Sequence, residues 1–446
     1  MAVISDTFAI FVAFINVKIL LAMDKSIAKH LIVEYQQMAA SVELIERDYT
    51  LSDGLNHVLV GLRRAGKSYL LYQQIKALIS AGHSTEEMLY FNFEDDRLEG
   101  LTLADLDTIK TSYEELFPHR PIFLLDEVQN IEGWEHFARR IADQRYRVYI
   151  TGSNARMLSR EIAGTLGGRY MVESVYPYSF SEYLRASGIT LTRHWELSPE
   201  RAAVVRHYNT YLHYGGLPEV QAITPAMRRA WLNNLYNKIF FGDILMRYSV
   251  RNTMALKVMM RKLAESVGQP CSYTRIAGVV AAAGVKTRAE TIIDYIEYAK
   301  DSCLIFEVEN YAAKIAEKMA NKKYYFADNG ILNLFLLNPN PALIENIVAI
   351  ALHAHYEDVC YYHDSVEVDF YLWEQRTAIQ VAWTIADVTT RERETRALIR
   401  LSRRLPVEHM FIITNDEQDT IIIGEQHIHV VPAWLWLNNI ASLTGL

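Results

Sequence analysis

The sequence predicts an α/β fold in the first half of the chain, with a mostly parallel sheet flanked by helices. Between His57 and about Glu182, short β-branched runs alternate with helical stretches, which is typical of layered α/β domains. A glycine-punctuated loop separates the first apolar run from a helical stretch. A later apolar run ends in two adjacent carboxylates, Asp126 and Glu127. These three observations together favour a ligand-binding sheet of the open α/β type.

The elements of this first half follow from apolar runs bounded by turn residues. The expected strands span His57–Val60, Met88–Phe93, Pro121–Leu125, Val148–Thr151 and Tyr170–Val175. Helices are expected to begin near Ser68, Ala104, Trp134 and Ala155.

The second half begins with a helical and aromatic segment from about Pro199 to Val250. Paired glycines and a proline within Tyr214–Glu219 interrupt it and force a turn. Three further helices are expected at 254–267, 272–283 and 287–300, with Ser272 and Thr287 as N-caps. Strand candidates at 304–308 and 323–326 follow them. Three helices with a closing hairpin predict a winged-helix arrangement.

The last part of the chain, from about Ile331, predicts a small α/β domain. It combines a helix through 343–355, strands near 366–373 and 378–381, a charged helix at 389–403 and a final strand pair. The predicted domains are an apolar extension (1–23), the α/β core (24–190), a helical lid or connector (191–252), the winged helix (253–329) and the small α/β domain (330–446).

Composition restricts the class of protein. Half of the 446 residues are hydrophobic and 22% are charged, which is the composition of a globular chain and excludes a disordered one. A net charge of −8 argues against a surface that coats polyanions generally, but leaves room for a local basic site. The three cysteines are widely spaced and form no CxxC pattern, so neither a disulfide framework nor a zinc site is expected. We expect a cytoplasmic location.

The amino terminus contains two apolar runs, Phe8–Ile15 and Ile19–Met23, which Asn16 and Lys18 separate. Each run is shorter than the about 20 residues of a membrane-spanning helix, and the basic start of a signal peptide is missing. We therefore expect no membrane association. A start at Met23 is an open alternative, because an amphipathic helix is expected from Asp24 onward.

The loop Gly61–Ser68 has the pattern GxxxxGK[ST]. A polyphosphate requires converging backbone N–H groups, and a glycine-punctuated loop that opens a helix supplies them. Lys67 is expected to reach the β and γ phosphates, and the Ser68 hydroxyl to ligate Mg²⁺. The sequence thus predicts a P-loop that binds ATP with Mg²⁺. Its expected contacts with the nucleotide are Gly61, Arg64, Ala65, Gly66, Lys67, Ser68 and Tyr69.

The partner motif is the run Ile122–Glu127, in which a buried strand carries Asp126 and Glu127 at its carboxyl end. Ligands of open α/β sheets bind at that end. Asp126 is expected in the Mg²⁺ shell, and Glu127 is expected to polarise the attacking water. An ordinary strand with a solvated acidic end is the alternative interpretation.

The order of the motifs indicates a branch of the P-loop ATPases. The strand Met88–Phe93 lies in sequence between the P-loop and Asp126, which resembles the additional-strand branch. In the AAA+ class of this branch, the strand that follows the one with the acidic pair ends in a polar residue, which senses the γ-phosphate or the attacking water. Ser153 and Asn154 are the sensor candidates here, with a simple turn as the alternative.

The segments GLRRAGKS, FLLDEVQNIEGWE, ITGSNARML, GGRY, YPYSFSEYL and YGGLPE occur in this order. They resemble a prokaryotic family of AAA-type ATPases with a carboxy-terminal domain of unknown function, over most of the chain from about residue 25. The resemblance implies that Arg169 lies near the nucleotide, either in its own subunit or as a finger toward a neighbouring copy. A surface ion pair of Arg169 is the alternative.

The carboxy-terminal half of that family resembles a winged helix followed by a nuclease-like fold of the PD-(D/E)xK type. Glu345 and Asp369 match two of its metal-binding positions. Where the motif has Glu-x-Lys, this chain has Gln380 and Ala382, which removes one carboxylate and the ammonium group. The resemblance therefore implies a degenerate structural domain rather than an active nuclease.

The predicted winged helix, residues 254–301, holds seven Lys or Arg and five Asp or Glu, a net charge of +2. Arg275, Lys286 and Arg288 fall where such modules contact DNA phosphates. A protein-contact module is the alternative reading of the same residues.

The sequence as a whole predicts an ATP-hydrolysing protein whose nucleotide state repositions a winged-helix and nuclease-like module. Three classes of function remain open: an ATPase acting on nucleic acid, an NTP switch for signalling or defence that binds a protein partner, and a nuclease gated by ATP. A homo-oligomer is compatible with each of them.

Overall fold

The computed structural model describes residues 23–52, 54–155, 164–314 and 321–440. They form two compact units. The first contains the described residues up to Val60 together with Lys67–Glu173, and the second contains Gly61–Gly66 together with the described residues from Ser174 onward. The apolar extension therefore lies outside the described residues, apart from Met23. No described helix is long and apolar enough to cross a bilayer.

A five-stranded sheet forms the centre of the first half of the chain. Its strands are β1 (Asn56–Gly61), β2 (Met88–Asn92), β3 (Ile122–Asp126), β4 (Val148–Gly152) and β5 (Tyr170–Val175), in the order β2-β3-β4-β1-β5. β4 pairs in parallel with both β3 and β1, and β2 pairs in parallel with β3. Every residue of β3 and β4 is buried, as expected for a parallel sheet covered on both faces.

The strand order confirms the predicted fold class. Although β4 follows β3 in sequence, it lies in space between β3 and the P-loop strand β1. All five predicted strands are present within one residue of their expected bounds. The helix predicted near Ala155 falls mainly on 156–163, which lie outside the described residues.

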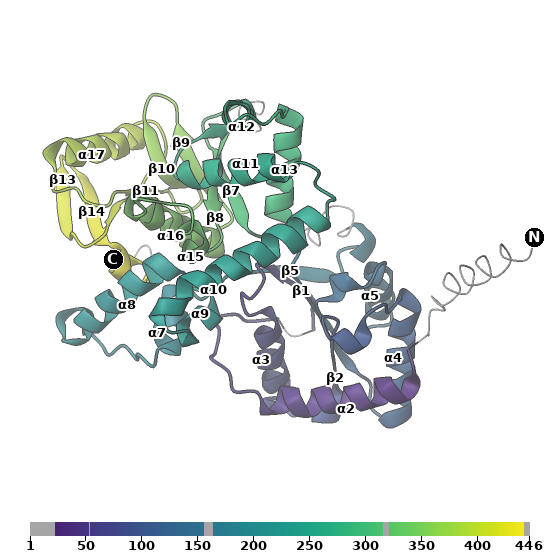
Figure 1. Ribbon diagram of the computed structural model, residues 1–446. Coiled ribbons are helices and arrows are strands. Elements are labelled where there is room, and N and C mark those ends of the chain that lie inside the picture. Colours follow the sequence, from purple (N-terminus) through teal and green to yellow (C-terminus); the bar gives the residue numbers. More distant parts are fainter. Residues whose placement is uncertain (1–22, 53, 156–163, 315–320, 441–446) are drawn as a thin grey trace, which may run out of the picture. The chain divides into compact units, whose positions relative to one another are not determined.

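Helices surround this sheet, as Figure 1 shows. They are α2 (Lys25–Ser41), α3 (Lys67–Ser80), α4 (Leu103–Leu116) and α5 (Trp134–Asp143), with short turns η1 (Thr85–Glu87), η2 (Asp96–Leu98) and η3 (Val128–Asn130). Asp24 caps α2, because its carboxylate accepts a hydrogen bond from the Ser26 N–H group. Gln36 then ties α2 to the sheet by donating to the Met88 carbonyl at 3.0 Å.

The second unit begins with a helical segment. Its elements are α7 (Phe180–Ala186), η5 (Trp195–Leu197), α8 (Glu200–Tyr214), α9 (Pro218–Ala222), α10 (Pro225–Lys238) and a π-helix, η6 (Ile239–Met246). The glycine turn between α8 and α9 is held by Asp328, whose carboxylate accepts from the Gly216 N–H group at 2.9 Å. π-Helical turns are rare and frequently occur at functional sites.

Three helices and a hairpin follow. The helices are α11 (Thr253–Glu265), α12 (Tyr273–Ala282) and α13 (Ala289–Asp301), and the antiparallel hairpin consists of β7 (Ile305–Asn310) and β8 (Asn321–Phe326). Ser272 caps α12, as expected. The predicted Thr287 cap is wrong, because Arg288 occupies the N-cap of α13 and makes no capping bond through its side chain. The assignment of a winged helix stays a prediction.

The hairpin belongs to a nine-stranded sheet with the order β13-β14-β12-β11-β10-β9-β7-β8-β6. Its remaining strands are β6 (Cys271–Ser272), β9 (Val359–His363), β10 (Glu367–Leu372), β11 (Thr377–Val381), β12 (His409–Thr414), β13 (Asp419–Ile423) and β14 (Gln426–Pro432). The associated helices are α15 (Asn329–Leu332), α16 (Asn340–His355), α17 (Val388–Ser402) and α18 (Ala433–Trp436). Because β7 pairs in parallel with β9, one sheet runs across the predicted boundary at 329/330.

Candidate nucleotide site

The loop between β1 and α3 depends on its two glycines. A Cβ atom at Gly61 would lie 2.0 Å from the Val175 carbonyl oxygen, so only glycine allows β1 to pass this close to β5. Gly66 has a φ of 97°, a left-handed conformation that strains other residues. Arg64 adopts a similar conformation with a φ of 65°. The loop therefore has the tight backbone that a phosphate cradle requires.

Lys67 and Ser68 form the first turn of α3, where the N–H groups of a helix start favour an anion. Lys67 is buried, with a relative exposure of 3%. Its Nζ lies 3.5 Å from Oε1 of Glu127. Tyr69, by contrast, is 53% exposed.

Asp126 lies fully buried at the end of β3. Its carboxylate accepts hydrogen bonds from the hydroxyls of Tyr90, at 2.8 Å, and of Thr151 and Ser68. Burial raises the pKa of Asp126, and the charge of Glu127 raises it further, while these three donors oppose the shift. Ser68 and Asp126 thus bring two oxygen ligands together, which is the type of donor that Mg²⁺ prefers.

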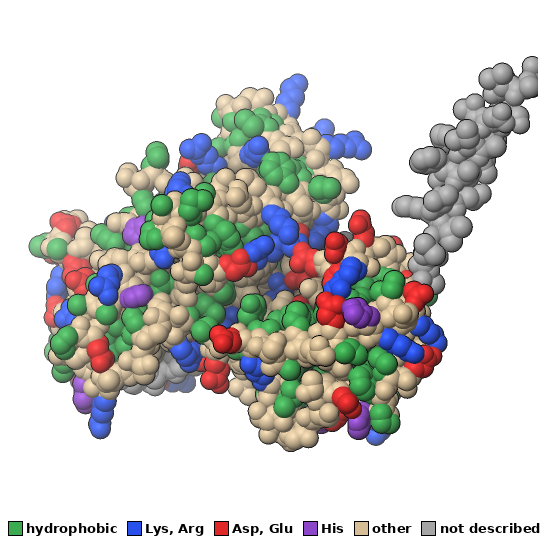
Figure 2. All heavy atoms as spheres, turned by 60° about the horizontal axis from the view of Figure 1, so that its bottom comes forward, with side chains coloured by type: hydrophobic (Ala, Val, Ile, Leu, Met, Phe, Trp, Pro, Cys, Tyr) green, Lys and Arg blue, Asp and Glu red, His purple; other side chains and the backbone are tan. Residues whose placement is uncertain are grey.

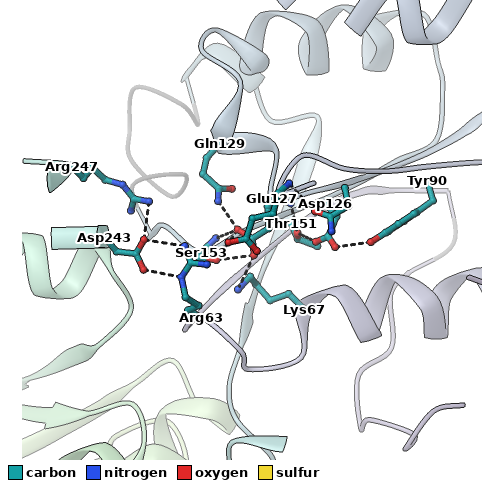
Figure 3. Close-up of polar contacts among 12 residues, drawn as sticks. Arg63, Lys67, Tyr90, Asp126, Glu127, Gln129, Thr151, Ser153, Asp243 and Arg247 are labelled. Carbon is teal, nitrogen blue, oxygen red and sulfur yellow. Dashed lines mark hydrogen bonds and ion pairs between the residues drawn. The ribbon is translucent and has the colours of Figure 1, made fainter. Parts of the chain in front are cut away.

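Glu127 follows Asp126 in a left-handed conformation with a φ of 52°, which turns the chain away from the strand direction. Its N–H group donates to the Thr151 hydroxyl at 2.9 Å. Its carboxylate accepts from the Ser153 hydroxyl at 2.7 Å and from Gln129 Nε2 at 2.5 Å. Figure 3 shows Lys67, Ser153 and Gln129 directed at this carboxylate.

The predicted sensor and finger residues have different surroundings. Asn154 is buried, with a relative exposure of 8%, and follows directly after Ser153. Arg169 instead forms an ion pair with Asp143, at 2.5 Å from Nε to Oδ1, and donates to the Leu166 and Gly167 carbonyls. The structure thus shows the ion pair that was the alternative for Arg169, and its contact with a nucleotide stays a prediction.

Sequence reasoning did not single out three residues of this site: Tyr90, Thr151 and Gln129. Thr151 had a detectable signal, because it ends a strand beside the one that carries Asp126. The sequence carries no such signal for Tyr90 and Gln129, because their roles depend on where their side chains point from β2 and η3.

Two further loop residues make ion pairs within the second unit. Arg63 binds Asp243 of the π-helix through two hydrogen bonds, of 3.0 and 3.1 Å, and Arg247 lies 3.4 Å from the same carboxylate (Figure 3). Arg64 pairs with Glu219, and its guanidinium lies 5.7 Å from the ring centroid of Trp231. The loop is therefore tied to the helical segment 217–247.

The residues that match the nuclease-like motif in the carboxy-terminal domain lie around a lysine that no sequence motif singles out. Lys323 of β8 is fully buried, and its Nζ lies 3.1 Å from Asp369, 3.1 Å from Glu367 and 3.6 Å from Glu345. Burial raises the pKa of Glu345 to about 7, together with the charge of Asp369. An ammonium group is thus present at this site, although Ala382 does not supply it.

Gln380 stands where a nuclease of this type has a carboxylate. Its Oε1 accepts from the Asp369 N–H group at 2.8 Å, and its Nε2 donates to Glu394 at 2.8 Å. The Gln380 amide is therefore already hydrogen-bonded through both its oxygen and its nitrogen. Lys323 lies between the carboxylates of Glu345 and Asp369. No cluster of three His, Cys, Asp or Glu in the described ranges is arranged to hold a metal ion.

The three basic residues predicted to contact DNA are exposed. Arg275 lies in the first turn of α12, while Lys286 and Arg288 lie on the connection from α12 to α13. On the face of the molecule drawn in Figure 2, basic and acidic side chains are interspersed.

Two family models match separate parts of the chain. A family model described as an AAA domain matches residues 56–184. A second model, described as a domain of unknown function (DUF8612), matches residues 205–342.

Two relatives match nearly the whole chain. An uncharacterized protein of Haemophilus influenzae is 30% identical over 85% of this chain and 93% of its own length. The uncharacterized protein MJ1544 of Methanocaldococcus jannaschii is 28% identical over 93% of this chain and 96% of its own length.

Solved structures with a similar arrangement are distant. The Walker-type ATPase PABY2304 of Pyrococcus abyssi has a TM-score of 0.38 and 14% identity, covering 70% of this chain and 95% of its own. The ORC1 protein of Aeropyrum pernix, solved in complex with DNA, has a TM-score of 0.27 and 14% identity, covering 73% of this chain and 93% of its own.

Proposed function

The chain belongs to the same protein family as the Haemophilus influenzae relative, and we propose that this AAA-type P-loop protein hydrolyses ATP with the help of Mg²⁺. The match of residues 56–184 to an AAA domain supports this proposal. So does the position of the P-loop after β1 and of the Asp126-Glu127 pair after β3, with β4 between these two strands in the sheet.

The residues of the P-loop and of the neighbouring strands have separate roles in this proposal. The N–H groups of Gly61–Ser68 and the Lys67 ammonium bind the β and γ phosphates of ATP. Ser68 and Asp126 would hold Mg²⁺, which neutralises charge that develops on the transferred phosphoryl group. Tyr90 and Thr151 orient the Asp126 carboxylate by donating to it.

The contact between Lys67 and Glu127 carries the proposal of hydrolysis. The two groups lie 3.5 Å apart and are both buried. Bound phosphates attract the same ammonium group, so ATP draws Lys67 away from Glu127. The freed carboxylate then accepts a hydrogen bond from a water molecule and acts as the general base. Ser153 holds the carboxylate in place from the other side.

We further propose that nucleotide binding acts on the second unit through the loop. Arg63 and Arg64 are neighbours of the phosphate cradle, and they pair with Asp243 and Glu219 of the helical segment. A change of loop conformation on ATP binding alters both pairs at once. The conformation of the helical segment thereby becomes sensitive to the nucleotide.

ATP turnover by the purified full chain tests this function. Wild type is expected to hydrolyse ATP only with Mg²⁺, and Lys67→Ala to lose both ATP binding and turnover. Turnover that persists in Lys67→Ala would show that the activity belongs to another site or to a contaminant. Adding DNA to the assay separates an ATPase that acts on nucleic acid from a switch that binds a protein partner, because only the first is stimulated.

A further inference from the structure

The helix α8 has two faces of different character. Val204, Tyr208 and Leu212 are buried and form its core side. A second face follows the spacing of three and four residues that places side chains together on a helix. It consists of Ala202, Val205, Arg206, Asn209, Thr210 and His213. Each of these six residues is exposed or half-buried, so this face is accessible to a ligand.

The second face of α8 lines a cavity of about 600 Å³. The short helix α15 packs against both α8 and α10, and the three lie in the second unit (Figure 1). Arg229 of α10 and Asn333, which follows α15, line the same cavity. Its volume is in the range of sites that hold small molecules. The cavity is thus built by segments that lie far apart in the sequence.

Hydrogen bonds to backbone carbonyls hold one wall of the cavity in place. Asn333 donates through Nδ2 to the His213 carbonyl at 2.9 Å, which ties the segment after α15 to the end of α8. Arg229 donates through Nη1 and Nη2 to the carbonyls of Asn333 and Leu334, at 3.3 Å each. A guanidinium group has five N–H donors. Arg229 is therefore oriented by these two bonds and still has donors for a ligand.

The cavity carries positive charge without a compensating acid. Arg206 and Arg229 line it, and none of its lining residues is an Asp or a Glu. Within the described part of the chain, neither arginine forms an ion pair. Other exposed arginines do, such as Arg97 with Glu34. A ligand that enters this cavity therefore meets two guanidinium groups and no carboxylate that would repel an anion.

The neighbouring His207 of α8 is sensitive to the same charge. Burial lowers the pKa of His207, and the charges of Arg206 and Arg228 lower it further. A nearby cation lowers the pKa of an imidazole because it opposes the protonated form. No carboxylate is among the groups that shift this pKa. The surroundings of Arg206 are thus electropositive, in agreement with the composition of the cavity.

We propose that this cavity binds a small phosphate monoester, whose phosphate contacts Arg206 and Arg229 and whose organic part lies against Ala202 and Val205. A phosphate monoester carries a charge of about −1.5 to −2 at pH 7, which matches two arginines without acidic partners. A single carboxylate would neutralise only one of them. Guanidinium groups also bind phosphate oxygens through two parallel hydrogen bonds.

The proposed ligand site is separate from the proposed ATPase function. Its residues belong to α8, α10 and the segment after α15, and none of them belongs to the P-loop or to the acidic pair after β3. The cavity therefore goes beyond ATP hydrolysis and does not depend on it.

Isothermal titration calorimetry with phenyl phosphate tests the proposal. The full chain carries Lys67→Ala in every sample, so that the P-loop lacks its ammonium group and contributes little to phosphate binding. We expect phenyl phosphate to bind with a Kd below about 1 mM. Arg206→Ala and Arg229→Ala, each added to this background, should weaken binding by about tenfold, because each removes charged hydrogen bonds to the phosphate.

Two further probes test the class of ligand. Inorganic phosphate lacks the organic part, and benzoate has an aromatic ring but only one negative charge. Each should bind at least about tenfold more weakly than phenyl phosphate. If either probe binds as tightly as phenyl phosphate, the proposed ligand class is wrong.

Arg193→Ala in the same background is the matched control. Arg193 is an exposed arginine between α7 and α8 that does not line the cavity, and its variant should bind phenyl phosphate like the parent. The proposal is overturned if phenyl phosphate does not bind, or if it binds equally well to Arg206→Ala, Arg229→Ala and the parent. An equal loss of affinity in the control overturns it as well. ATP turnover is measured separately on wild type, so that its absence counts against the proposed ATPase and not against the cavity.

Discussion

Arg63 of the P-loop and Asp243 of the π-helix form a two-bond ion pair although 180 residues separate them in sequence. The side chains are only 15% and 6% exposed. In such surroundings, removing one partner leaves an uncompensated charge that is costly to bury. This pair is therefore a strong constraint on the loop.

Asp243→Asn is expected to destabilise the chain by about 3 kcal/mol and to change its affinity for ATP. A double-mutant cycle combines Asp243→Asn with Arg63→Gln, and urea denaturation gives the free energy of unfolding of each protein in it. The coupling energy should be about 1–3 kcal/mol. Arg247→Gln is the control, because this arginine lies farther from Asp243, at 3.4 Å, and is expected to change stability much less. Additive effects of Asp243→Asn and Arg63→Gln would mean that the pair does not hold the loop.

Thr151→Val should reduce ATP turnover by about tenfold to a hundredfold while ATP binding persists. The hydroxyl donates to Asp126 and accepts from the Glu127 N–H group, so its loss removes one of the three donors to the Asp126 carboxylate and the acceptor of this N–H bond. Thr151→Ser keeps the hydroxyl and is expected to restore most of the rate. Steady-state kinetics of both variants check this, and a Thr151→Val enzyme with the wild-type rate would contradict the role.

Gly61→Ala should lower the melting temperature strongly. The added methyl group would meet the Val175 carbonyl at 2.0 Å, and overpacking of this kind costs about 1–3 kcal/mol or more. The matched control is Gly278→Ala in α12, where nothing lies within 4 Å of the added Cβ and alanine favours the helix by up to about 1 kcal/mol. Differential scanning fluorimetry should show a lower melting temperature for Gly61→Ala and a higher one for Gly278→Ala.

Asp328 makes stability depend on pH. Burial raises the pKa of this carboxyl to about 6, although hydrogen bonds from backbone N–H groups oppose the rise. A raised pKa means that the folded chain holds the proton more tightly than the unfolded chain does. The resulting stabilisation is complete below about pH 4 and is lost as the pH rises through about 6.

Urea midpoints of wild type and Asp328→Asn at several pH values test this effect. The advantage of wild type over the variant should shrink between about pH 4 and about pH 7. A difference that is independent of pH over this range would show that Asp328 does not titrate there.

The sequence was sufficient to predict the first sheet and to select the residues that bind phosphate and magnesium in our proposal. Their signals are local: a glycine pattern before a helix, and two carboxylates at the end of an apolar run. The fold class followed because the order of these motifs limits the strand order of the sheet. Local patterns also placed α16 and α17 within a few residues.

The remaining features depend on which segments meet in space. Lys323 lies 46 residues from Asp369 in sequence, and no local pattern connects β8 to β10. The pairing of β7 with β9 could not be predicted from the sequence either, because strand pairing depends on how both segments pack. The Thr287 cap was wrong by one residue, a common error at helix ends.

Comparison of wild type with Glu127→Gln tests the central claim most directly, with ATP binding and ATP turnover measured on the same preparations. The proposed function predicts that both proteins bind ATP with similar affinity in the presence of Mg²⁺. It also predicts that the variant loses turnover by a factor of about 10²–10⁴, because an amide cannot accept the proton of the attacking water. A wild type that neither binds nor hydrolyses ATP, or a variant that hydrolyses it at the wild-type rate, would contradict the account.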